Sequence, residues 1–329
     1  MSGDGPILEV RSLKLSILTD EGVARILDHV DFALQPGRIL GVVGESGCGK
    51  STVIRAILGI LPHGARIDAG TIRFAGENLL ALGESELNRR IRGSRIGFVP
   101  QDPYLALNPV FKIGAQLLEI MRWHAPDGGR AEHRARILRL LRRVQLPDPE
   151  AALDRYPHQF SGGQRQRLLI AAALACSPAM VIADEPTTAL DVTTQQQIID
   201  LLRDLVHEFG LSMLFVTHDL GVVAELCDDI CVIYAGQSVE SGPTPAVIAA
   251  PEHPYTRALL ACHPDRADSF VGIPGAVPSP LSAGPGCRFA PRCAEARPIC
   301  AHRPAHPASR SAGRRLDCVL YDVPESVAG

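Results

Sequence analysis

The sequence predicts an α/β protein with a parallel sheet core, a helical subdomain and a small irregular C-terminal extension that contains cysteines. The continuously apolar run Ile39–Val43 is typical of a buried parallel strand. Two further apolar runs, Met180–Ala183 and Met213–Thr217, enclose the helical stretch Thr193–Phe209, and such a strand–helix–strand unit implies parallel strands. After about residue 262 proline and glycine become dense and periodicity fades, so a separate segment is expected there.

The N-terminal part is expected to place two strands before the first buried one. Residues 7–18 alternate apolar and polar side chains, as a half-buried strand does. Ile26–Leu34 is also strand-like and ends at the turn signal Pro36-Gly37. A glycine-rich loop follows Val43, and a helical pattern runs from Ser51 to Leu61.

The middle of the chain is expected to be mainly helical over residues 102–175. Its stretch Ala131–Val144 carries apolar side chains on one face and arginines on the other, as an amphipathic helix does. Further elements are expected as strands at Ile96–Pro100 and Cys231–Ala235 and a helix at Arg165–Cys176. The predicted organisation is one domain over residues 1–262, with this helical subdomain inside it, and an extension over residues 263–329.

Composition excludes several classes of protein. The chain has 329 residues, 46% of them apolar, which suits a folded protein of two domains or one large domain with an appendage. Its net charge of −3 lacks the basic excess typical of nucleic-acid-binding proteins. No apolar run approaches the roughly 18–20 residues that span a bilayer, and no secretory signal precedes the first strand, so a cytoplasmic location is expected. In that compartment the nine cysteines are not expected to form disulfides.

A phosphate-binding loop is predicted between the first buried strand and the next helix. Its eight residues fit the pattern G-x-x-x-x-G-K-[ST], and Thr52 follows them in the helix: Gly44, Glu45, Ser46, Gly47, Cys48, Gly49, Lys50 and Ser51. Glycines let successive N–H groups point at phosphate oxygens, Lys50 reaches the β- and γ-phosphates, and the Ser51 hydroxyl ligates Mg²⁺. The chain has only three lysines (the others are Lys14 and Lys112), which supports a functional role for Lys50. We expect Cys48 to be partly exposed and reactive.

Further polar residues stand at predicted strand ends, where α/β sheets bind ligands. Asp184 and Glu185 follow the strand at Met180, and these residue types suit Mg²⁺ coordination and activation of the attacking water, respectively. Gln101 and His218 follow two other strands.

The string Ser161-Gly162-Gly163-Gln164 precedes a predicted helix. A serine and two glycines there expose N–H donors at the helix N-terminus, which predicts a second anion site.

Together these residues resemble the ATP-binding subunit of ABC transporters. The resemblance identifies residues 44–51 as Walker A, Gln101 as the Q-loop glutamine, Ser161–Gln164 as the signature motif, and Ala189-Leu190-Asp191 as the D-loop. It identifies Asp184 as Walker B, Glu185 as the catalytic glutamate and His218 as the switch histidine, with Gln101 also near the Mg²⁺. The strings QDPYLALNPV, YPHQFSGGQRQR, ADEPTTALDVT, THDLGVVAE, HPYTRALL and GCRFAPRC are similar to the oligopeptide/dipeptide and nickel importer branch.

The resemblance implies a P-loop ABC ATPase with a RecA-like sheet core that drives solute import, with peptides as the leading substrate. ATP and Mg²⁺ would bind between two ATPase subunits paired head to tail, the second being a related subunit or another copy of this chain. Two integral membrane permeases and, indirectly, an extracytoplasmic solute-binding protein complete such a system at the cytoplasmic face of the inner membrane, without nucleic acid. The alternatives are an importer of nickel or another small solute, and a soluble ABC ATPase without a transport role.

Four of the nine cysteines gather in the extension: Cys287, Cys293, Cys300 and Cys318. Their wide spacing argues mildly against zinc, and four thiolates also suit an iron–sulfur cluster. The resembled branch includes members with a [4Fe–4S] cluster in this extension, which favours a cluster over zinc or over unmetallated thiols. A structural role is expected for it, and a redox or metal sensor is the rival role. The cysteines at 176, 227, 231 and 262 are expected to be core fillers.

Overall fold

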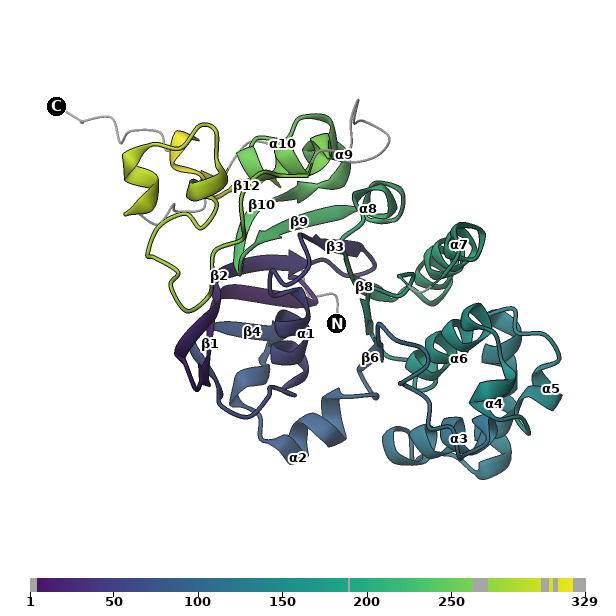
Figure 1. Ribbon diagram of the computed structural model, residues 1–329. Coiled ribbons are helices and arrows are strands. Elements are labelled where there is room, and N and C mark those ends of the chain that lie inside the picture. The colour runs from purple at the N-terminus through teal and green to yellow at the C-terminus, as the bar shows by residue number, and fades with distance from the viewer. Residues whose placement is uncertain (1–4, 189, 263–271, 303–307, 310–312, 322–329) are drawn as a thin grey trace. The chain divides into compact units, whose positions relative to one another are not determined.

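The computed structural model describes residues 5–188, 190–262, 272–302, 308–309 and 313–321. They belong to two compact units (Figure 1). Unit 1 comprises Met1–Leu34, Leu40–Leu80 and Thr217–Gly329, and unit 2 comprises Gln35–Ile39 and Ala81–Val216. Each unit is described by itself below.

Unit 1 contains a four-stranded antiparallel sheet in the order β2-β1-β4-β5. Its strands are β1 (Leu8–Thr19), β2 (Gly22–Leu34), β4 (Ala65–Phe74) and β5 (Glu77–Asn78). The predicted alternation of β1 is present, since Leu8, Val10, Leu13 and Leu15 are buried. The pairing of β1 with β2 shifts register beside Leu13, which keeps these apolar side chains on the buried face.

A second set of strands in unit 1 places the phosphate-binding loop. Strand β3 (Ile39–Val43) is buried throughout and pairs in parallel with β9 (Asp229–Tyr234), and β9 pairs antiparallel with β10 (Gln237–Pro243). The extension continues this sheet, because β12 (Arg315–Leu316) pairs with β10 and β11 (Ala308–Ser309) pairs with β12. The helices of this unit are α1 (Lys50–Leu58), α8 (Leu220–Leu226), α9 (Thr244–Ala249) and α10 (Pro254–Ala261), with short 3-10 turns at Ala290–Arg292, Pro298–Ala301 and Val319–Tyr321.

Unit 2 combines a short parallel sheet with the helical subdomain. The sheet has the order β6-β7-β8, with β6 (Ile96–Val99), β7 (Met180–Asp184) and β8 (Ser212–Thr217) all parallel. The turn η1 (Leu79–Ala81) ends at the first residue of this part of unit 2. The remaining elements of unit 2 are the π-helix η2 (Leu87–Ile91), the turn η3 (Pro157–Gln159) and the helices α2 (Glu84–Glu86), α3 (Ile113–His124), α4 (Arg130–Arg143), α5 (Pro149–Ala152), α6 (Gly162–Leu174) and α7 (Val192–Phe209). Figure 1 shows α3 to α6 gathered into one group of helices. Helix α7 connects β7 to β8, as the strand–helix–strand pattern predicts.

The apolar face expected for the middle helix is buried. In α4 the side chains of Ile137, Leu138 and Leu141 are at most 9% exposed, and Val144 just beyond its end is fully buried. In a helix, side chains three or four positions apart lie on the same face, and this periodicity was the basis for predicting an amphipathic helix here. Two of the four predicted core cysteines, Cys227 and Cys231, are buried, whereas Cys176 and Cys262 are half-buried. Within the described residues, no helix is long and apolar enough to cross a membrane.

Candidate functional site

The predicted phosphate-binding loop, residues 44–51, connects β3 to α1. Lys50 is the first residue of α1, and its ammonium donates hydrogen bonds to the Gly44 carbonyl at 2.7 Å and to the Glu45 carbonyl at 3.1 Å. Its side chain is buried although it is charged, with a residue exposure of 5%. A buried ammonium needs such acceptors, so the loop is built around this lysine. Ser51 and Thr52 continue the first turn of the helix, where backbone N–H groups lack intrahelical partners.

Two glycines of the loop are required by its geometry. A Cβ at Gly44 would lie 2.0 Å from the Ile233 carbonyl oxygen, so no side chain fits there. Gly49 has a φ of 105°, in the left-handed region that other residues rarely adopt. The loop therefore takes a tight path against the neighbouring strand β9.

The expectation that Cys48 is exposed is wrong. Cys48 is only 2% exposed, and its sulfur lies 3.9 Å from the Lys50 ammonium. Burial raises the pKa of the Cys48 thiol, although the nearby Lys50 charge opposes this rise. The Cys48 thiol is therefore a small buried side chain that packs within the loop, and it is not expected to be reactive.

Gln101 and Glu185 come together in unit 2. The Gln101 side-chain amide donates a hydrogen bond to Glu185 Oε2 at 3.2 Å, and the Thr188 hydroxyl donates to the same oxygen at 3.0 Å. Glu185 follows Asp184, the buried last residue of β7. It adopts a φ of 44° and donates its backbone N–H to the Val216 carbonyl at 2.8 Å. A non-glycine residue in this region is strained, and such strain is found at functional sites.

The string Ser161–Gln164 forms the predicted helix N-terminus. The Ser161 hydroxyl accepts the Gln164 N–H at 3.3 Å, and the Gln164 side chain accepts the Ser161 N–H at 3.1 Å, which is a capping box. A Cβ at Gly163 would lie 2.6 Å from Cγ2 of Thr194, so this glycine allows α6 and α7 to approach closely.

Asp191 organises the start of α7 beside Gly163. Its carboxylate accepts the Thr194 N–H at 2.9 Å and the Thr194 hydroxyl at 2.8 Å. These hydrogen bonds lower the pKa of Asp191. Ala189 lies outside the described residues, and its neighbour Leu190 donates its N–H to the Thr187 carbonyl.

The remaining predicted site residues take the expected places on their elements. Ser46 and Gly47 lie in the loop, and Gly47 has a positive φ. His218 is exposed and follows β8 directly, before the Asp219 side chain caps α8 by accepting the N–H groups of Gly221 and Val222. The loop and His218 belong to unit 1, and the residues from Gln101 to Asp191 belong to unit 2.

All four extension cysteines line one small cavity in unit 1. The cavity is lined by Cys287, Cys293, Cys300 and Cys318, together with residues that include His253 and Phe289. Burial raises the pKa of the Cys287 thiol to about 12 and that of the Cys318 thiol to about 11, and neighbouring thiols add to both rises. Among the described residues, no three or more His, Cys, Asp or Glu side chains are grouped so that they could hold a metal ion, although the four thiols line this one cavity.

Two aromatic residues and one arginine beside the loop were missed by the sequence analysis. The Glu45 N–H donates to the Tyr255 hydroxyl at 3.0 Å, and Arg292 forms an ion pair with the Glu45 side chain at 2.8 Å. Tyr234 accepts a hydrogen bond from the same arginine at 3.2 Å. Tyr255 and Arg292 lie in the strings HPYTRALL and GCRFAPRC, which carried the resemblance, and Tyr234 is the last residue of β9. The sequence alone does not show which groups these side chains contact.

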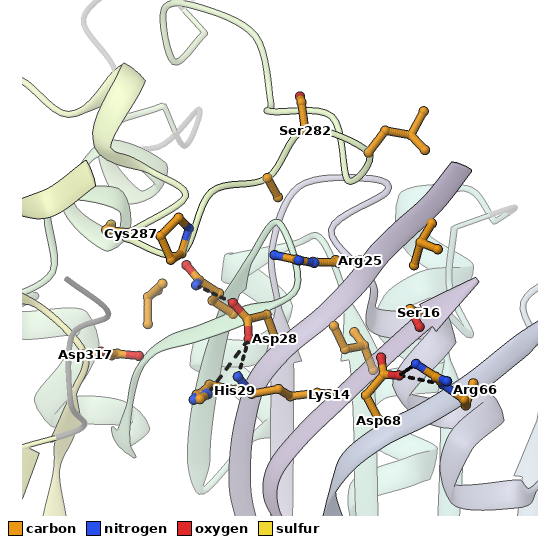
Figure 2. Close-up of a pocket in the computed structure, with 17 residues that line it drawn as sticks. Lys14, Ser16, Arg25, Asp28, His29, Arg66, Asp68, Ser282, Cys287 and Asp317 are labelled. Carbon is orange, nitrogen blue, oxygen red and sulfur yellow. Dashed lines mark hydrogen bonds and ion pairs between the residues drawn. The ribbon is translucent and has the colours of Figure 1, made fainter. Parts of the chain in front are cut away.

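A larger cavity of about 840 Å³ lies in unit 1 between β1, β2 and the extension (Figure 2). Figure 2 shows Lys14 and His29 directed toward Asp28, and Cys287 and Ser282 on the extension side. Lys14 lies 3.1 Å from Asp28, and a second pair of opposite charges, Arg66 and Asp68, lies on the same wall. Because its walls carry both signs of charge, the cavity has no clear preference for a cation or an anion.

Known proteins with similar sequences contain the same two regions, an ATP-binding domain and a C-terminal extension. Residues 27–188 match the family model described as ABC transporter, and residues 239–300 match the model of the oligopeptide/dipeptide transporter C-terminal region. The chain is 46% identical to a putative peptide import ATP-binding protein of Brucella abortus, with 95% of this chain and 94% of the relative covered. It is 43% identical to the oligopeptide transport ATP-binding protein OppD of Salmonella typhimurium, with 91% and 89% covered.

Solved structures show the same similarity. A dimeric post-hydrolysis state of the ATP-binding cassette MJ0796, bound to ADP and phosphate, matches with a TM-score of 0.64 at 28% identity and covers 72% of this chain and 98% of that one. The cbiO1 protein of Clostridium perfringens, part of the ABC transporter complex cbiONQ, matches with a TM-score of 0.63 at 27% identity, over 75% and 92% of the two chains.

Proposed function

This chain belongs to the ATP-binding subunits of ABC transporters, in the branch with an oligopeptide/dipeptide transporter C-terminal region, and from this premise we propose that it powers the import of di- and oligopeptides. It hydrolyses ATP, as members of this family do. The observation that carries the substrate class is the 46% identity, over 95% of the chain, to a relative named as a peptide import protein. Peptides are therefore favoured over nickel or another small solute, and a transport role over a soluble ATPase without one.

The site residues divide into two groups in this proposal. Residues of the first group form the segment whose backbone N–H groups and Lys50 charge hold the triphosphate, although the Glu45 N–H donates to Tyr255 instead: Gly44, Glu45, Ser46, Gly47, Cys48, Gly49, Lys50, Ser51 and Thr52. Residues of the second group face the nucleotide of a partner ATPase: Ser161, Gly162, Gly163, Gln164 and Asp191. The capping box at Ser161 supports the second group, because it fixes the N-terminus of α6 and its partial positive charge.

Mg²⁺ is the metal expected with ATP, and it neutralises charge on the phosphate oxygens when bound. The oxygen atoms of Ser51, Asp184 and Gln101 are the hard donors that suit it. Asp184 lies buried at the end of β7, and a carboxylate in this position suits a partner of opposite charge.

Glu185 is the proposed catalytic base. Its carboxylate orients the attacking water and accepts the water's proton as oxygen attacks the γ-phosphorus, while the bond from phosphorus to the ADP oxygen breaks and the electron pair stays on ADP. The hydrogen bonds from Gln101 and Thr188 hold that carboxylate in one direction, which supports this role. His218 is assigned to contact the transferred phosphate. Most of the catalysis is positioning and charge stabilisation.

Pairing with a second ATPase subunit, related to this chain or identical to it, completes the site. The signature motif of each subunit then covers the ATP on the loop of the other. Two membrane permeases bind the pair at the cytoplasmic face of the inner membrane. In unit 2 the segment after Gln101 exposes the apolar side chains of Leu105, Val110 and Phe111 by 85%, 70% and 55%, which supports permease docking there. An extracytoplasmic protein supplies the peptide.

The extension, residues 263–329, is proposed to hold a [4Fe–4S] cluster on its four cysteines, as a group that stabilises an irregular segment after the ATPase domain of residues 1–262. The convergence of Cys287, Cys293, Cys300 and Cys318 on one cavity supports this proposal. A metal cluster bound by these cysteines would cross-link parts of the extension, which has little apolar core of its own. Zinc and free thiols are the competing states.

Reconstitution tests the function. The chain, its ATPase partner, the two permeases and the solute-binding protein are reconstituted in vesicles that leave the ATPase subunits accessible from outside. We expect ATP-dependent uptake of a labelled dipeptide, and none with Ni²⁺. Uptake of Ni²⁺ without peptide uptake would contradict the peptide proposal, and ATP hydrolysis that is insensitive to permeases and solute would contradict the importer proposal.

A further inference from the structure

An arginine of the extension reaches the phosphate-binding loop. Arg292 Nη1 lies 2.8 Å from Glu45 Oε2, and Arg292 Nη2 lies 3.2 Å from Glu45 Oε1, across 247 positions of sequence. This is a two-pronged arginine–carboxylate pair, which fixes direction as well as distance. The Arg292 side chain is only 3% exposed, so the pair is shielded from solvent on the arginine side.

The remaining donors of Arg292 are bound as well. Its Nη2 donates to the Ile273 carbonyl at 2.8 Å, and its Nε donates to the Pro274 carbonyl at 2.9 Å. Nη1 also donates to the Tyr234 hydroxyl. The hydrogen bond to Glu45 raises the pKa of Arg292, so its charge is permanent. The guanidinium is therefore held by Ile273 and Pro274 of the extension and by Tyr234 of β9, and both of its Nη atoms also donate to Glu45.

Glu45 is also fixed through its backbone. Its N–H donates to the Tyr255 hydroxyl at 3.0 Å, and its carbonyl accepts the Lys50 ammonium. Tyr255 packs against Tyr234 and Phe289, with ring centroids 4.6 Å and 5.3 Å away. Phe289 of the extension precedes Arg292 by one short turn, so this aromatic cluster connects the extension to Tyr255, whose hydroxyl holds the loop.

The charge of Glu45 is unfavourable for its position. A carboxylate in a loop that binds a polyanionic triphosphate repels that ligand, and the repulsion is strong where water is excluded. Pairing with Arg292 cancels this charge and directs the carboxylate toward the extension. Without the arginine, Glu45 is free to repel phosphate or to compete for the Lys50 ammonium.

We propose that Arg292 is a positioning residue of the nucleotide site, so that docking of the C-terminal extension is a condition for tight ATP binding. This inference rests on the proposed function, because it assumes that residues 44–51 bind ATP. Arg292 directly precedes Cys293, which lines the cysteine cavity. A change in how Cys293 is held would therefore move Arg292 and, through it, Glu45 of the loop.

The test measures the dissociation constant of Mg-ATP for the full chain by equilibrium dialysis. Arg292→Gln is expected to weaken binding by about tenfold, the value of one charge-assisted hydrogen bond. Glu45→Gln keeps an oxygen acceptor for Arg292 and removes a negative charge beside the triphosphate, so it is expected to bind Mg-ATP more tightly than the wild type. The double variant is expected to regain most of the affinity, and the deficit of Arg292→Gln is expected to shrink at high salt.

Three outcomes separate this proposal from its alternatives. Persistent weak binding in the double variant would mean that Arg292 only supports the fold, which overturns the positioning role. Wild-type affinity in Arg292→Gln would also overturn it. Unchanged affinity in Lys50→Ala would instead overturn the loop as the ATP site, whatever Arg292 does.

A matched control comes from another ion pair between the ATPase part and the extension. Arg257 of α10 lies 2.5 Å from Glu295, and this ion pair includes no residue of the loop. Arg257→Gln is expected to leave ATP affinity unchanged. A loss equal to that of Arg292→Gln would show that any loosening of the extension suffices, and it would overturn the specific role of Arg292.

Discussion

Gln101 donates a hydrogen bond to Glu185 at 3.2 Å, although the two residues are 84 positions apart in the chain. Both follow parallel strands of unit 2, β6 and β7, whose carboxyl ends lie at one edge of the sheet. This contact links the proposed Q-loop glutamine to the proposed base. It joins a residue that leads into the helical subdomain to the group that would activate water.

Glu185→Gln is expected to abolish hydrolysis and to leave ATP binding intact. An amide cannot accept the proton of the attacking water, and loss of such a base lowers rates by about 100-fold or more. The measurement is phosphate release by the assembled transporter, with ATP affinity measured alongside. The partner subunit carries the equivalent substitution, so that its own site cannot supply activity. Wild-type turnover in this double assembly would remove Glu185 from the mechanism.

Lys50→Ala is expected to weaken ATP binding by about tenfold to 100-fold, since charge-assisted hydrogen bonds contribute about 1.5–3 kcal/mol. Lys112→Ala is the matched control, because Lys112 is another of the three lysines and pairs with Asp154 on the surface of unit 2. Equilibrium binding of a fluorescent ATP analogue checks both. Equal effects of the two substitutions would argue against a phosphate-binding role for Lys50.

Gly163→Ala is expected to destabilise the protein by about 1–3 kcal/mol through overpacking. The added Cβ would lie 2.6 Å from the Thr194 methyl group, and the Asp191 hydrogen bonds hold that threonine in place. Thr194→Ser removes the methyl group and keeps the hydroxyl, so the double variant is expected to regain stability.

Thermal unfolding checks the glycine prediction, with Gly83→Ala as its control. A Cβ at Gly83 meets no atom within 4 Å, so that substitution is expected to be nearly neutral. If Thr194→Ser fails to rescue Gly163→Ala, the close approach of α6 to α7 is not the cause of the loss.

Cys48 is expected to resist alkylation under native conditions. It is 2% exposed and burial raises its thiol pKa, so at pH 7 it is both shielded and protonated. The half-buried Cys176 and Cys262 are expected to react first. Timed maleimide labelling followed by peptide mass spectrometry gives the order. Labelling of Cys48 as fast as that of Cys176 would show that the loop opens readily.

Protein purified without oxygen is expected to contain iron and acid-labile sulfide and to show broad visible absorbance. Cys300→Ser is expected to lose them, whereas Cys176→Ser, which lies outside the cavity, retains them. Zinc at one per chain would favour the zinc alternative, and absence of both metals would leave four thiols. A redox-dependent ATPase rate that survives with the fold intact would identify a sensor instead of a structural group.

Local patterns predicted much of the fold. The strand Ile39–Val43 was predicted with its observed bounds, because a continuously apolar run needs burial on both faces. The strand β4, Ala65–Phe74, was missed because most of its side chains are half-buried or exposed, and its pairing with β1 defines it more than its own pattern does. The capping box at Ser161 lies within four residues, so the sequence could predict the helix start there.

The sequence by itself determined the family, the phosphate-binding loop and the types of residue at each strand end. These features depend on short spacings and on periodicity, and both are visible in stretches of neighbouring residues. Only the tertiary structure decided that Cys48 is buried, that four cysteines face one cavity, and that Arg292 pairs with Glu45. Each of these depends on segments far apart in the chain, and packing brings such segments together through contacts that no local pattern specifies.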